Sequence, residues 1–290
     1  MNNKIYLMAA LIAFASVGAL LIQPTVASAQ SSMIDNILNS ALPSSDTNDN
    51  NQPSQENSSS SSSAVPLSTS LSCGQVIKQS VKLTANLDCK TDGIIVGADG
   101  ITIDLNGFTL SGPGEKSSKV GIMFADNDGV TVQGPGTIQN FQAGALFSGG
   151  EDNKISRVTF TENEIAVFET GSKNVAIEDN LMFGNSIGVA AHSSSGSKLT
   201  TNLFKSNDLA GVTLVNSANN ELSMNTIQGS VNGIFLDGQS TKNNVNSNNV
   251  LQNRGVDLNN GNGLPTNIND NVFGDNNCNT SVPDGLCLGR

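Results

Sequence analysis

The feature that most constrains the fold is a repeat of 22 or 23 residues, which runs through most of the chain after a first interval of 28. A small residue opens each unit, and two columns of apolar residues follow in the same frame. Such regularity predicts a solenoid, in which each unit packs only on its neighbours. The opening column is Gly93, Gly121, Gly144, Ala166, Gly188, Gly211, Gly233 and Gly255; the apolar columns are Val132, Ile155, Ile177, Leu199, Leu222, Val245 and Ile268, and Phe160, Met182, Phe204, Ile227, Val250 and Phe273.

Each unit has the pattern of short strands rather than that of a leucine-rich repeat. Residues 188–209 contain three short apolar-alternating segments, GVAA, SKLT and NLFKSN, separated by turn residues. Alternation at a period of two predicts strands, and Gly, Asn, Ser and Asp predict turns. We therefore expect an all-β parallel β-helix of about eight coils, with three short strands in each coil.

Asparagine recurs at two positions of the unit. Asn tolerates the left-handed backbone of a tight corner, and stacked amides can hydrogen-bond along a stack. The alternative is a polar ladder that binds a glycan or Ca²⁺. Because polar groups at buried corners need partners in any case, we interpret the first column as a structural ladder. That column is Asn180, Asn202, Asn225, Asn248 and Asn271, and the second is Asn140, Asn163, Asn185, Asn207, Asn253 and Asn276, interrupted by Ser230.

The repeat resembles a known group of proteins. The frame I-x-x-N-x-[apolar]-x-x-N-x-x-G-[apolar], as it begins at Ile177, and the opening segment GADGITIDLNGFTLSGPG at residues 97–114 are similar to the right-handed parallel β-helix proteins of the pectate-lyase-like superfamily, with NosD-like, PbH1-type repeats. The resemblance extends over residues 73–287 and implies a right-handed coil. It says little about activity, because such proteins include lyases, hydrolases, epimerases, adhesins and non-enzymatic surface proteins.

The N-terminal part of the chain has a different character. Residues 1–29 read as a signal peptide, with Lys4, an apolar stretch at 8–22 and an Ala-Ser-Ala cleavage site. Residues 30–70 form a Ser- and Asn-rich tail, expected to be disordered apart from a short amphipathic helix at 33–41 within SMIDNILNSAL. The β-helix domain then occupies residues 71–290. We expect the mature chain to be secreted or on the cell surface, with no transmembrane span after signal cleavage.

Charge and cysteine content narrow the classes of partner. The formal net charge of −11 argues against nucleic acid, which needs a basic surface to neutralise its phosphates. Four cysteines in an exported chain favour disulfides over a metal site. Three pairings are open from the sequence, and we expect the local one, Cys73 with Cys89 and Cys278 with Cys287, closing the two ends of the domain.

The carboxylates offer weak candidates for catalysis. The motifs of polygalacturonases and alginate epimerases are absent. Maturation proteins for copper-containing nitrous oxide reductase share the repeat type, but copper would require clustered His, Cys or Met, and the chain has one His. No metal or other cofactor is expected, and Ca²⁺, although possible, has no support in the sequence. The weak catalytic candidates are Glu169, Asp208 and Asp237.

Glu169 interrupts a column that otherwise contains apolar residues. A carboxylate buried there would have a raised pKa unless it found a partner. We expect instead that the strand ends early, at Thr170 and Gly171, and that Glu169 turns outward.

A row of large apolar residues is expected on the outer face of one strand stack, which is unusual for a monomer and typical of a contact surface. The row could stack on sugar rings, or it could be covered by the segment at 32–42 or by a partner. We favour a cover, because a domain without Trp or Tyr is a poor platform for glycans. The expected binding surface is Met123, Leu146, Phe168, His192, Phe235 and Asp237.

These observations predict an exported, non-catalytic β-helix protein that recognises polysaccharide or another surface component. One alternative is a polysaccharide lyase or glycoside hydrolase that acts on uronate-containing polymers. Another is a structural protein whose coil ends or apolar row pack against other chains.

Overall fold

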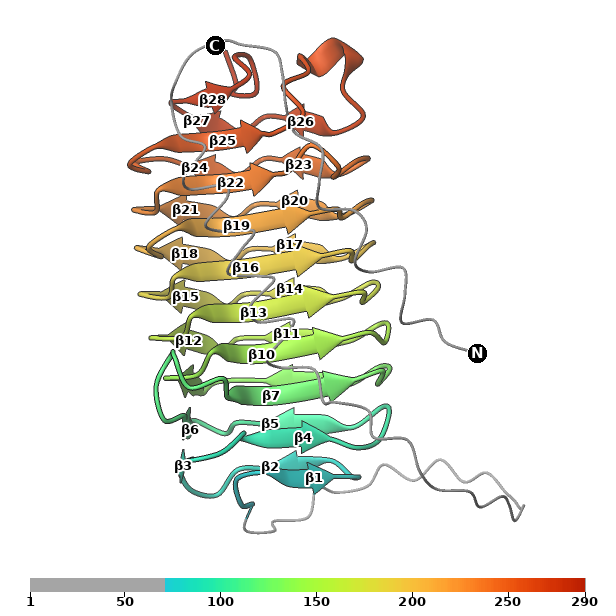
Figure 1. Ribbon diagram of the computed structural model, residues 1–290, viewed down its shortest axis with the longest axis vertical. Coiled ribbons are helices and arrows are strands. Elements are labelled where there is room, and N and C mark those ends of the chain that lie inside the picture. Colours follow the sequence, from blue (N-terminus) through green and yellow to red (C-terminus); the bar gives the residue numbers. More distant parts are fainter. Residues whose placement is uncertain (1–70, 290) are drawn as a thin grey trace, which may run out of the picture.

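The computed structural model describes residues 71–289, and these residues form a single β-solenoid of about nine stacked coils (Figure 1). Every strand pairing along the stack is parallel, and each coil contributes one strand to each of three sheets. The expected fold class, a right-handed parallel β-helix with three short strands per coil, is confirmed, with one coil more than expected. The expected signal peptide, and the tail with the short helix expected in it, lie outside the described residues. Within residues 71–289, no helix is long and apolar enough to cross a membrane.

The first sheet has the longest strands, several of six residues, and runs the full height of the molecule. It consists of β1 (Gln75–Ile77), β4 (Ile94–Val96), β7 (Val120–Ala125), β10 (Ala143–Ser148), β13 (Ile165–Thr170), β16 (Ile187–His192), β19 (Ala210–Val215), β22 (Asn232–Leu236), β25 (Val256–Asn260) and β28 (Ser281–Val282).

The second and third sheets are made of strands of two or three residues, and each contains nine strands. The second sheet consists of β2 (Val81–Lys82), β5 (Thr102–Asp104), β8 (Thr131–Gln133), β11 (Lys154–Ser156), β14 (Ala176–Glu178), β17 (Lys198–Thr200), β20 (Glu221–Ser223), β23 (Asn244–Asn246) and β26 (Val272–Gly274). The third consists of β3 (Leu87–Asp88), β6 (Thr109–Ser111), β9 (Thr137–Gln139), β12 (Thr159–Thr161), β15 (Leu181–Phe183), β18 (Leu203–Lys205), β21 (Thr226–Gln228), β24 (Asn249–Val250) and β27 (Asn277–Cys278).

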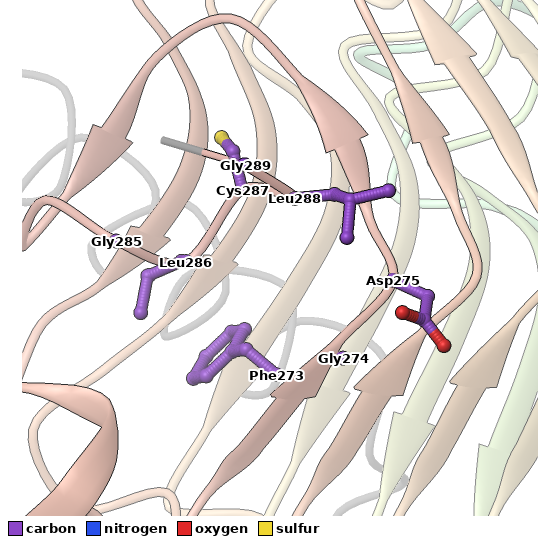
Figure 2. Close-up of a pocket in the computed structure, with 8 residues that line it drawn as sticks. All are labelled: Phe273, Gly274, Asp275, Gly285, Leu286, Cys287, Leu288 and Gly289. Carbon is purple, nitrogen blue, oxygen red and sulfur yellow. The ribbon is translucent and has the colours of Figure 1, made fainter.

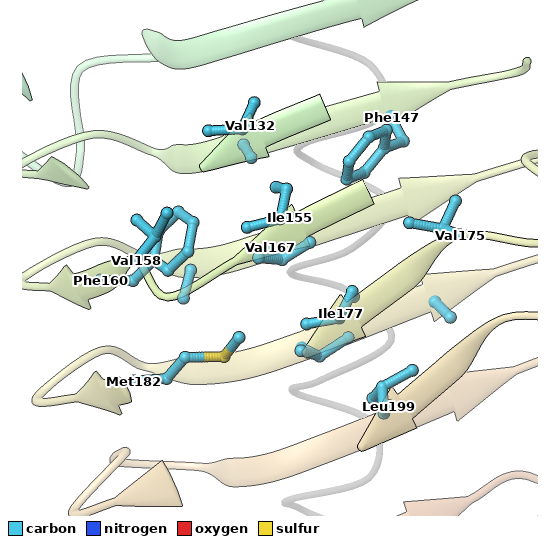
Figure 3. Close-up of a cluster of buried hydrophobic side chains, with 14 of the residues drawn as sticks. Val132, Phe147, Ile155, Val158, Phe160, Val167, Val175, Ile177, Met182 and Leu199 are labelled. Atoms are coloured by element: carbon cyan, nitrogen blue, oxygen red, sulfur yellow. The ribbon is translucent and has the colours of Figure 1, made fainter. Parts of the chain in front are cut away.

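The core lies inside the coil, where the middle residue of each short strand meets the same residue of the next coil. Ile155 pairs with Val132 of the preceding coil and with Ile177 of the following coil, and Phe160 pairs with Met182 (Figure 3). All of these side chains are completely buried. Similar residue types in register pack without gaps, so the apolar columns of the sequence are the inner faces of the second and third sheets.

The small opening residue of each unit allows the chain to turn closely against the coil above. A Cβ atom added to Gly188 would lie 2.5 Å from the backbone oxygen of Gly211 and equally close to the ring of Phe204. A methyl group cannot fit at either distance, so the need for a small residue here comes from close contact between coils.

Asparagine side chains occupy the buried corners and connect one coil to the next. The amide group of Asn202 donates to Ile177 O at 2.7 Å and to Asn225 Oδ1 at 3.1 Å, while Asn225 Oδ1 also accepts from Asn202 N at 3.0 Å. The same contacts recur from coil to coil, so each amide satisfies backbone groups that a corner would otherwise leave unpaired.

The predicted frame is wrong after β25, because the chain there makes an excursion of several residues that contains the short 3₁₀ helix η1 (Thr266–Ile268). Val245 pairs with Phe273 rather than with Ile268, and Val250 pairs with Cys278. The first asparagine column therefore continues from Asn248 to Asn276, not to Asn271.

Asn271, which was predicted to end the first column, instead belongs to a third ladder with Asn220 and Asn243. Neither predicted column contains those two residues. Asn220 N donates to Asn243 Oδ1 at 3.0 Å, and Asn243 N donates to Asn271 Oδ1 at 2.9 Å. This ladder lies at the corner before the second sheet, where Ser197 N donates to Asn220 Oδ1.

Both ends of the solenoid carry a disulfide. Cys73 is bonded to Cys89, and Cys278 is bonded to Cys287, which are the pairings expected from the sequence. Each bond lies where the coil stack ends and has a neighbouring coil on one side only. Crosslinks at these positions limit fraying of the terminal coils and indicate an oxidising compartment outside the cytoplasm.

Candidate functional site

The three outer faces of the solenoid differ in their chemistry, although the interior is the same throughout. On the second sheet, acidic and basic side chains face outward in pairs. Lys82 Nζ lies 3.2 Å from Asp104 Oδ2, and Lys154 Nζ lies 2.6 Å from Glu178 Oε2. In each of these ion pairs the lysine neutralises the carboxylate, and we assign this face no binding role.

The outward side chains of the third sheet are almost uncharged. Between β6 and β24, Lys205 is the single ionisable side chain at an outward position of this sheet, in a protein whose formal net charge is −11. Hydroxyl and amide groups dominate, and Gln139 Nε2 donates to Ser111 Oγ at 3.1 Å from one coil to the next. We call this surface the neutral face; it consists of Thr109, Ser111, Thr137, Gln139, Thr159, Thr161, Leu181, Phe183, Leu203, Lys205, Thr226, Gln228 and Asn249.

An apolar patch lies at the middle of the neutral face. Leu181 pairs with Leu203 in the next coil, and Phe183 lies beside them in register with Lys205. Both Phe183 and Leu203 are 39 % exposed, which is high for large apolar side chains in ordered strands. Threonine-bearing strands flank the patch on both sides, namely β12 and β21. The result is a surface with an apolar centre that is flanked by hydrogen-bonding side chains.

The apolar row predicted on the first sheet does face outward, but it is not open. Leu146 pairs with Phe168, and Phe168 with Ala190, yet the exposed fractions of these side chains are 2 %, 0 % and 0 %. Phe235 is 8 % exposed, and only Met123 is half-buried. These residues therefore cannot stack on a sugar in this structure. Of the two expectations for the row, sugar stacking and a cover, the burial favours a cover.

Two polar residues expected near that row have local surroundings of their own. His192 is half-buried at the end of β16. Asp237 follows β22, and its Oδ1 accepts hydrogen bonds from Ser240 Oγ at 2.7 Å and from Asn216 N at 3.1 Å. These hydrogen bonds stabilise a corner of the coil, so we assign Asp237 a structural role.

Glu169 lies inside the solenoid, contrary to the expectation that its strand ends early. Strand β13 continues to Thr170, and Glu169 stacks between Phe147 and Ala191 with no exposed surface. Its Oε2 accepts a hydrogen bond of 2.6 Å from Ser197 Oγ. Burial raises the pKa of Glu169 to about 7, although the hydroxyls of Ser197 and Ser172 act in the opposite direction.

The three catalytic candidates do not form an active site. Glu169 is enclosed in the core and cannot touch a polymer, Asp237 holds a corner, and Asp208 is exposed, with its backbone oxygen accepting from Arg254 Nη2 at 2.7 Å. Glycoside hydrolysis needs two carboxyl groups that face each other across a bond. The geometry of these three residues does not offer such a pair.

A cavity of about 510 Å³ opens at the C-terminal end of the solenoid (Figure 2). Phe273 and Leu286 point toward each other there, and Asp275 is the ionisable residue of the lining. With a lining that is mainly glycine and apolar, the cavity offers no set of groups for catalysis. It is the incompletely filled end of the last coil.

Comparison with solved structures gives matches of low sequence identity. The crystal structure of the Dettilon tailspike protein aligns with a TM-score of 0.48 and 16 % identity, over 66 % of this chain and 43 % of the tailspike. An exopolygalacturonase from Thermotoga maritima gives 0.42 and 9 %, over 69 % and 71 % of the two chains. The A-module of the mannuronan C-5 epimerase AlgE4 from Azotobacter vinelandii gives 0.37 and 12 %, over 70 % and 80 %. The chain thus spans less than half of the tailspike, and no curated protein matches it.

A family model described as "Periplasmic copper-binding protein (NosD)" matches residues 77–285. The described residues do not fit the copper in that description, because all four cysteines form disulfides and His192 is the only histidine of the chain. Within residues 71–289, no three His, Cys, Asp or Glu side chains form a group that could hold a metal ion. Of the methionines in this part of the chain, Met182 lies in the core, Met123 is half-buried on the first sheet and Met224 is exposed. Since the match covers most of the chain and the whole solenoid apart from its ends, the protein belongs to the NosD family.

Proposed function

We propose that the protein is an exported, non-catalytic binding protein that recognises a polysaccharide through the neutral face. The observation that carries the proposal is the chemistry of that face. Hydroxyl and amide groups repeat from coil to coil around the exposed side chains of Phe183 and Leu203 and the half-buried side chain of Leu181. The two disulfides support a site of action outside the cytoplasm, in the periplasm or at the cell surface.

A neutral sugar chain matches this surface in two respects. Its hydroxyl groups can exchange hydrogen bonds with threonine, glutamine and asparagine side chains, and the apolar face of a sugar ring can pack on Phe183 and the leucines. Binding would require little removal of charge from water, because Lys205 is the single charged group at the centre of the face. Repetition at the strand spacing of about 4.8 Å also offers equivalent contacts to a polymer made of repeating units.

The acidity of the protein favours a neutral polymer over a uronate. A polyanion would approach a protein of net charge −11 against electrostatic repulsion, and the neutral face offers it one lysine. This repulsion disfavours the alternative of a lyase or hydrolase that acts on uronate-containing polymers. The separate surroundings of Glu169, Asp208 and Asp237 disfavour it as well.

Affinity electrophoresis on gels that contain one polysaccharide at a time tests the proposal. We expect neutral polymers such as xylan or a β-glucan to retard the protein, while pectin and alginate have little effect. Phe183→Ala should weaken binding about tenfold, the equivalent of 1–2 kcal/mol for an aromatic ring that packs on its ligand. Val272→Ala is the matched control, because Val272 is an exposed apolar residue on the second sheet.

Two results would overturn the proposal. One is that no polymer binds, or that Phe183→Ala and Val272→Ala bind as the wild type does. The other is that reducing or unsaturated ends accumulate during incubation with a uronate polymer and disappear in Asp208→Asn, which would establish the enzymatic alternative.

A further inference from the structure

The outer surface of the first sheet carries a second hydrophobic cluster, separate from the core. Its side chains come from two outward columns of β7, β10, β13 and β16, and each is at most 2 % exposed. We call this surface the apolar face; it consists of Val120, Ala143, Leu146, Ile165, Phe168, Ile187 and Ala190.

A comparison of two phenylalanines shows that the sheet alone does not bury this cluster. Phe183 and Phe168 both point outward from strands of the same solenoid, but Phe183 is 39 % exposed and Phe168 is 0 % exposed. Short outward side chains such as Thr161, 8 % exposed, can be screened by their neighbours within the sheet. A phenylalanine extends beyond its neighbours, so complete burial requires a layer outside the sheet.

Residues 71–289 do not supply that layer with secondary structure. The first sheet is a single layer there, and η1, the helical segment of this part of the chain, buries none of its residues. The loop between β6 and β7 reaches the edge of the sheet at which its strands begin (Figure 1). Lys116 Nζ lies there 3.6 Å from Oε1 of Glu164, the residue before β13. A contact at the edge leaves the centre of the apolar face to be covered from elsewhere.

We propose that residues 32–42 of the same chain, SMIDNILNSAL, pack on the apolar face. Met33, Ile34, Ile37, Leu38 and Leu42 recur at the three- and four-residue spacing of one helical face, and the polar residues lie between them. A helix of this length is about 15 Å long. Three neighbouring strands with their side chains extend over a similar distance, about 15 Å, so the segment matches β10, β13 and β16 in size.

The connection to the solenoid allows this contact. Residues 43–70 join the segment to β1, and when extended they span up to about 90 Å. The centre of the apolar face, at β13, lies four strand spacings from β1, which is about 20 Å. The segment can therefore reach the face within one molecule at a small cost in loop closure.

Thiol labelling of the full exported chain tests the proposal, because all four native cysteines form disulfides and an introduced thiol is the only reactive one. Ala190→Cys places the thiol on the apolar face, and Thr226→Cys places it on the open neutral face. We expect Ala190→Cys to react with a maleimide at least tenfold more slowly than Thr226→Cys. Adding Ile34→Asp and Ile37→Asp should bring the two rates close together, since buried charges would release the segment.

Matched controls test whether the apolar side of residues 32–42 is what protects the thiol. Asn36→Asp with Asn39→Asp adds the same charge to the polar side of the segment and should leave the Ala190→Cys thiol protected. Ala143→Cys, at a buried position of the apolar face on β10, repeats the test in case Ala190→Cys disturbs the fold.

Three results would overturn the proposal: rapid labelling of both buried positions in the otherwise unchanged chain, protection that survives Ile34→Asp and Ile37→Asp, or protection that falls on dilution. The last would mean that a second copy covers the face. None of these outcomes depends on whether the neutral face binds polysaccharide.

Discussion

Replacing Glu169 by glutamine should remove a large part of the pH dependence of the stability of this domain. Glu169 is completely buried, and its pKa is raised from an ordinary value of 4.5 to about 7, mainly because burial disfavours the charged form. Below pH 4.5 the carboxyl is protonated in both the folded and the unfolded chain. Between pH 4.5 and 7 the unfolded chain loses this proton while the folded chain keeps it, so stability falls as the pH rises; above pH 7 both are ionised and the effect levels off.

The expected magnitude follows from the two pKa values. Each pH unit between them changes the free energy of unfolding by about 1.4 kcal/mol, so the wild type should lose roughly 3 kcal/mol between pH 4.5 and 8 through this group alone. Glutamine has nearly the same shape and cannot ionise. The difference in stability between Glu169→Gln and the wild type should therefore shift by roughly 3 kcal/mol in favour of the variant across this range.

Urea denaturation followed by far-UV circular dichroism, at intervals from pH 4.5 to 8, measures this difference. Thr170→Ala is the control, because Thr170 is the next residue of the same strand and points outward. Ser197→Ala removes a hydrogen bond that lowers the pKa of Glu169, so the fall in stability should extend to higher pH in that variant. Parallel pH profiles for the wild type and Glu169→Gln would refute the reasoning.

Three further predictions concern the solenoid itself. Asn202→Ala should lower the free energy of unfolding by about 3 kcal/mol, since it leaves several buried ladder groups unpaired, whereas Asn249→Ala at an exposed position should change it by less than about 0.5 kcal/mol; chemical denaturation distinguishes them. Gly188→Ala should cost about 2 kcal/mol or more in the same assay, because its methyl group would lie 2.5 Å from backbone oxygen of the next coil. Replacing Cys73 and Cys89 by serine should lower stability by about 3 kcal/mol through loss of a crosslink over a 16-residue separation, and hydrogen exchange should increase first in the N-terminal coils.

The coil can be predicted from the sequence because its signals are local and repeated. The apolar column through Ile155 and Ile177 and the asparagines at 180, 202, 225 and 248 all lie where the period places them. The prediction is wrong where the period changes. The excursion after β25 lengthens one coil, and a frame that assumes a constant length then assigns Asn271 to the wrong ladder.

The character of the outer faces was harder to predict for a physical reason. A period of two separates the two sides of a strand, but it does not say which side is open when both are apolar, as they are along β13. The buried carboxylate of Glu169 accepts a hydrogen bond from Ser197, which lies in the next coil at the corner before β17, and no local pattern contains that contact. Phe183 does carry a local signal, because it is a large apolar residue at an outward position of its strand, but the predicted binding surface lay on the first sheet and did not include it.

The nearly constant length of the coils has a consequence for how such a domain can change during evolution. Strands β13, β16, β19 and β22 begin at residues 165, 187, 210 and 232, so one whole unit raises the chain by one strand spacing and returns it to the same corner. Recombination that deletes or duplicates a unit therefore brings together ends that already fit. The domain can become shorter or taller in whole steps, while its closed ends are inherited unchanged and each outer surface gains or loses one row.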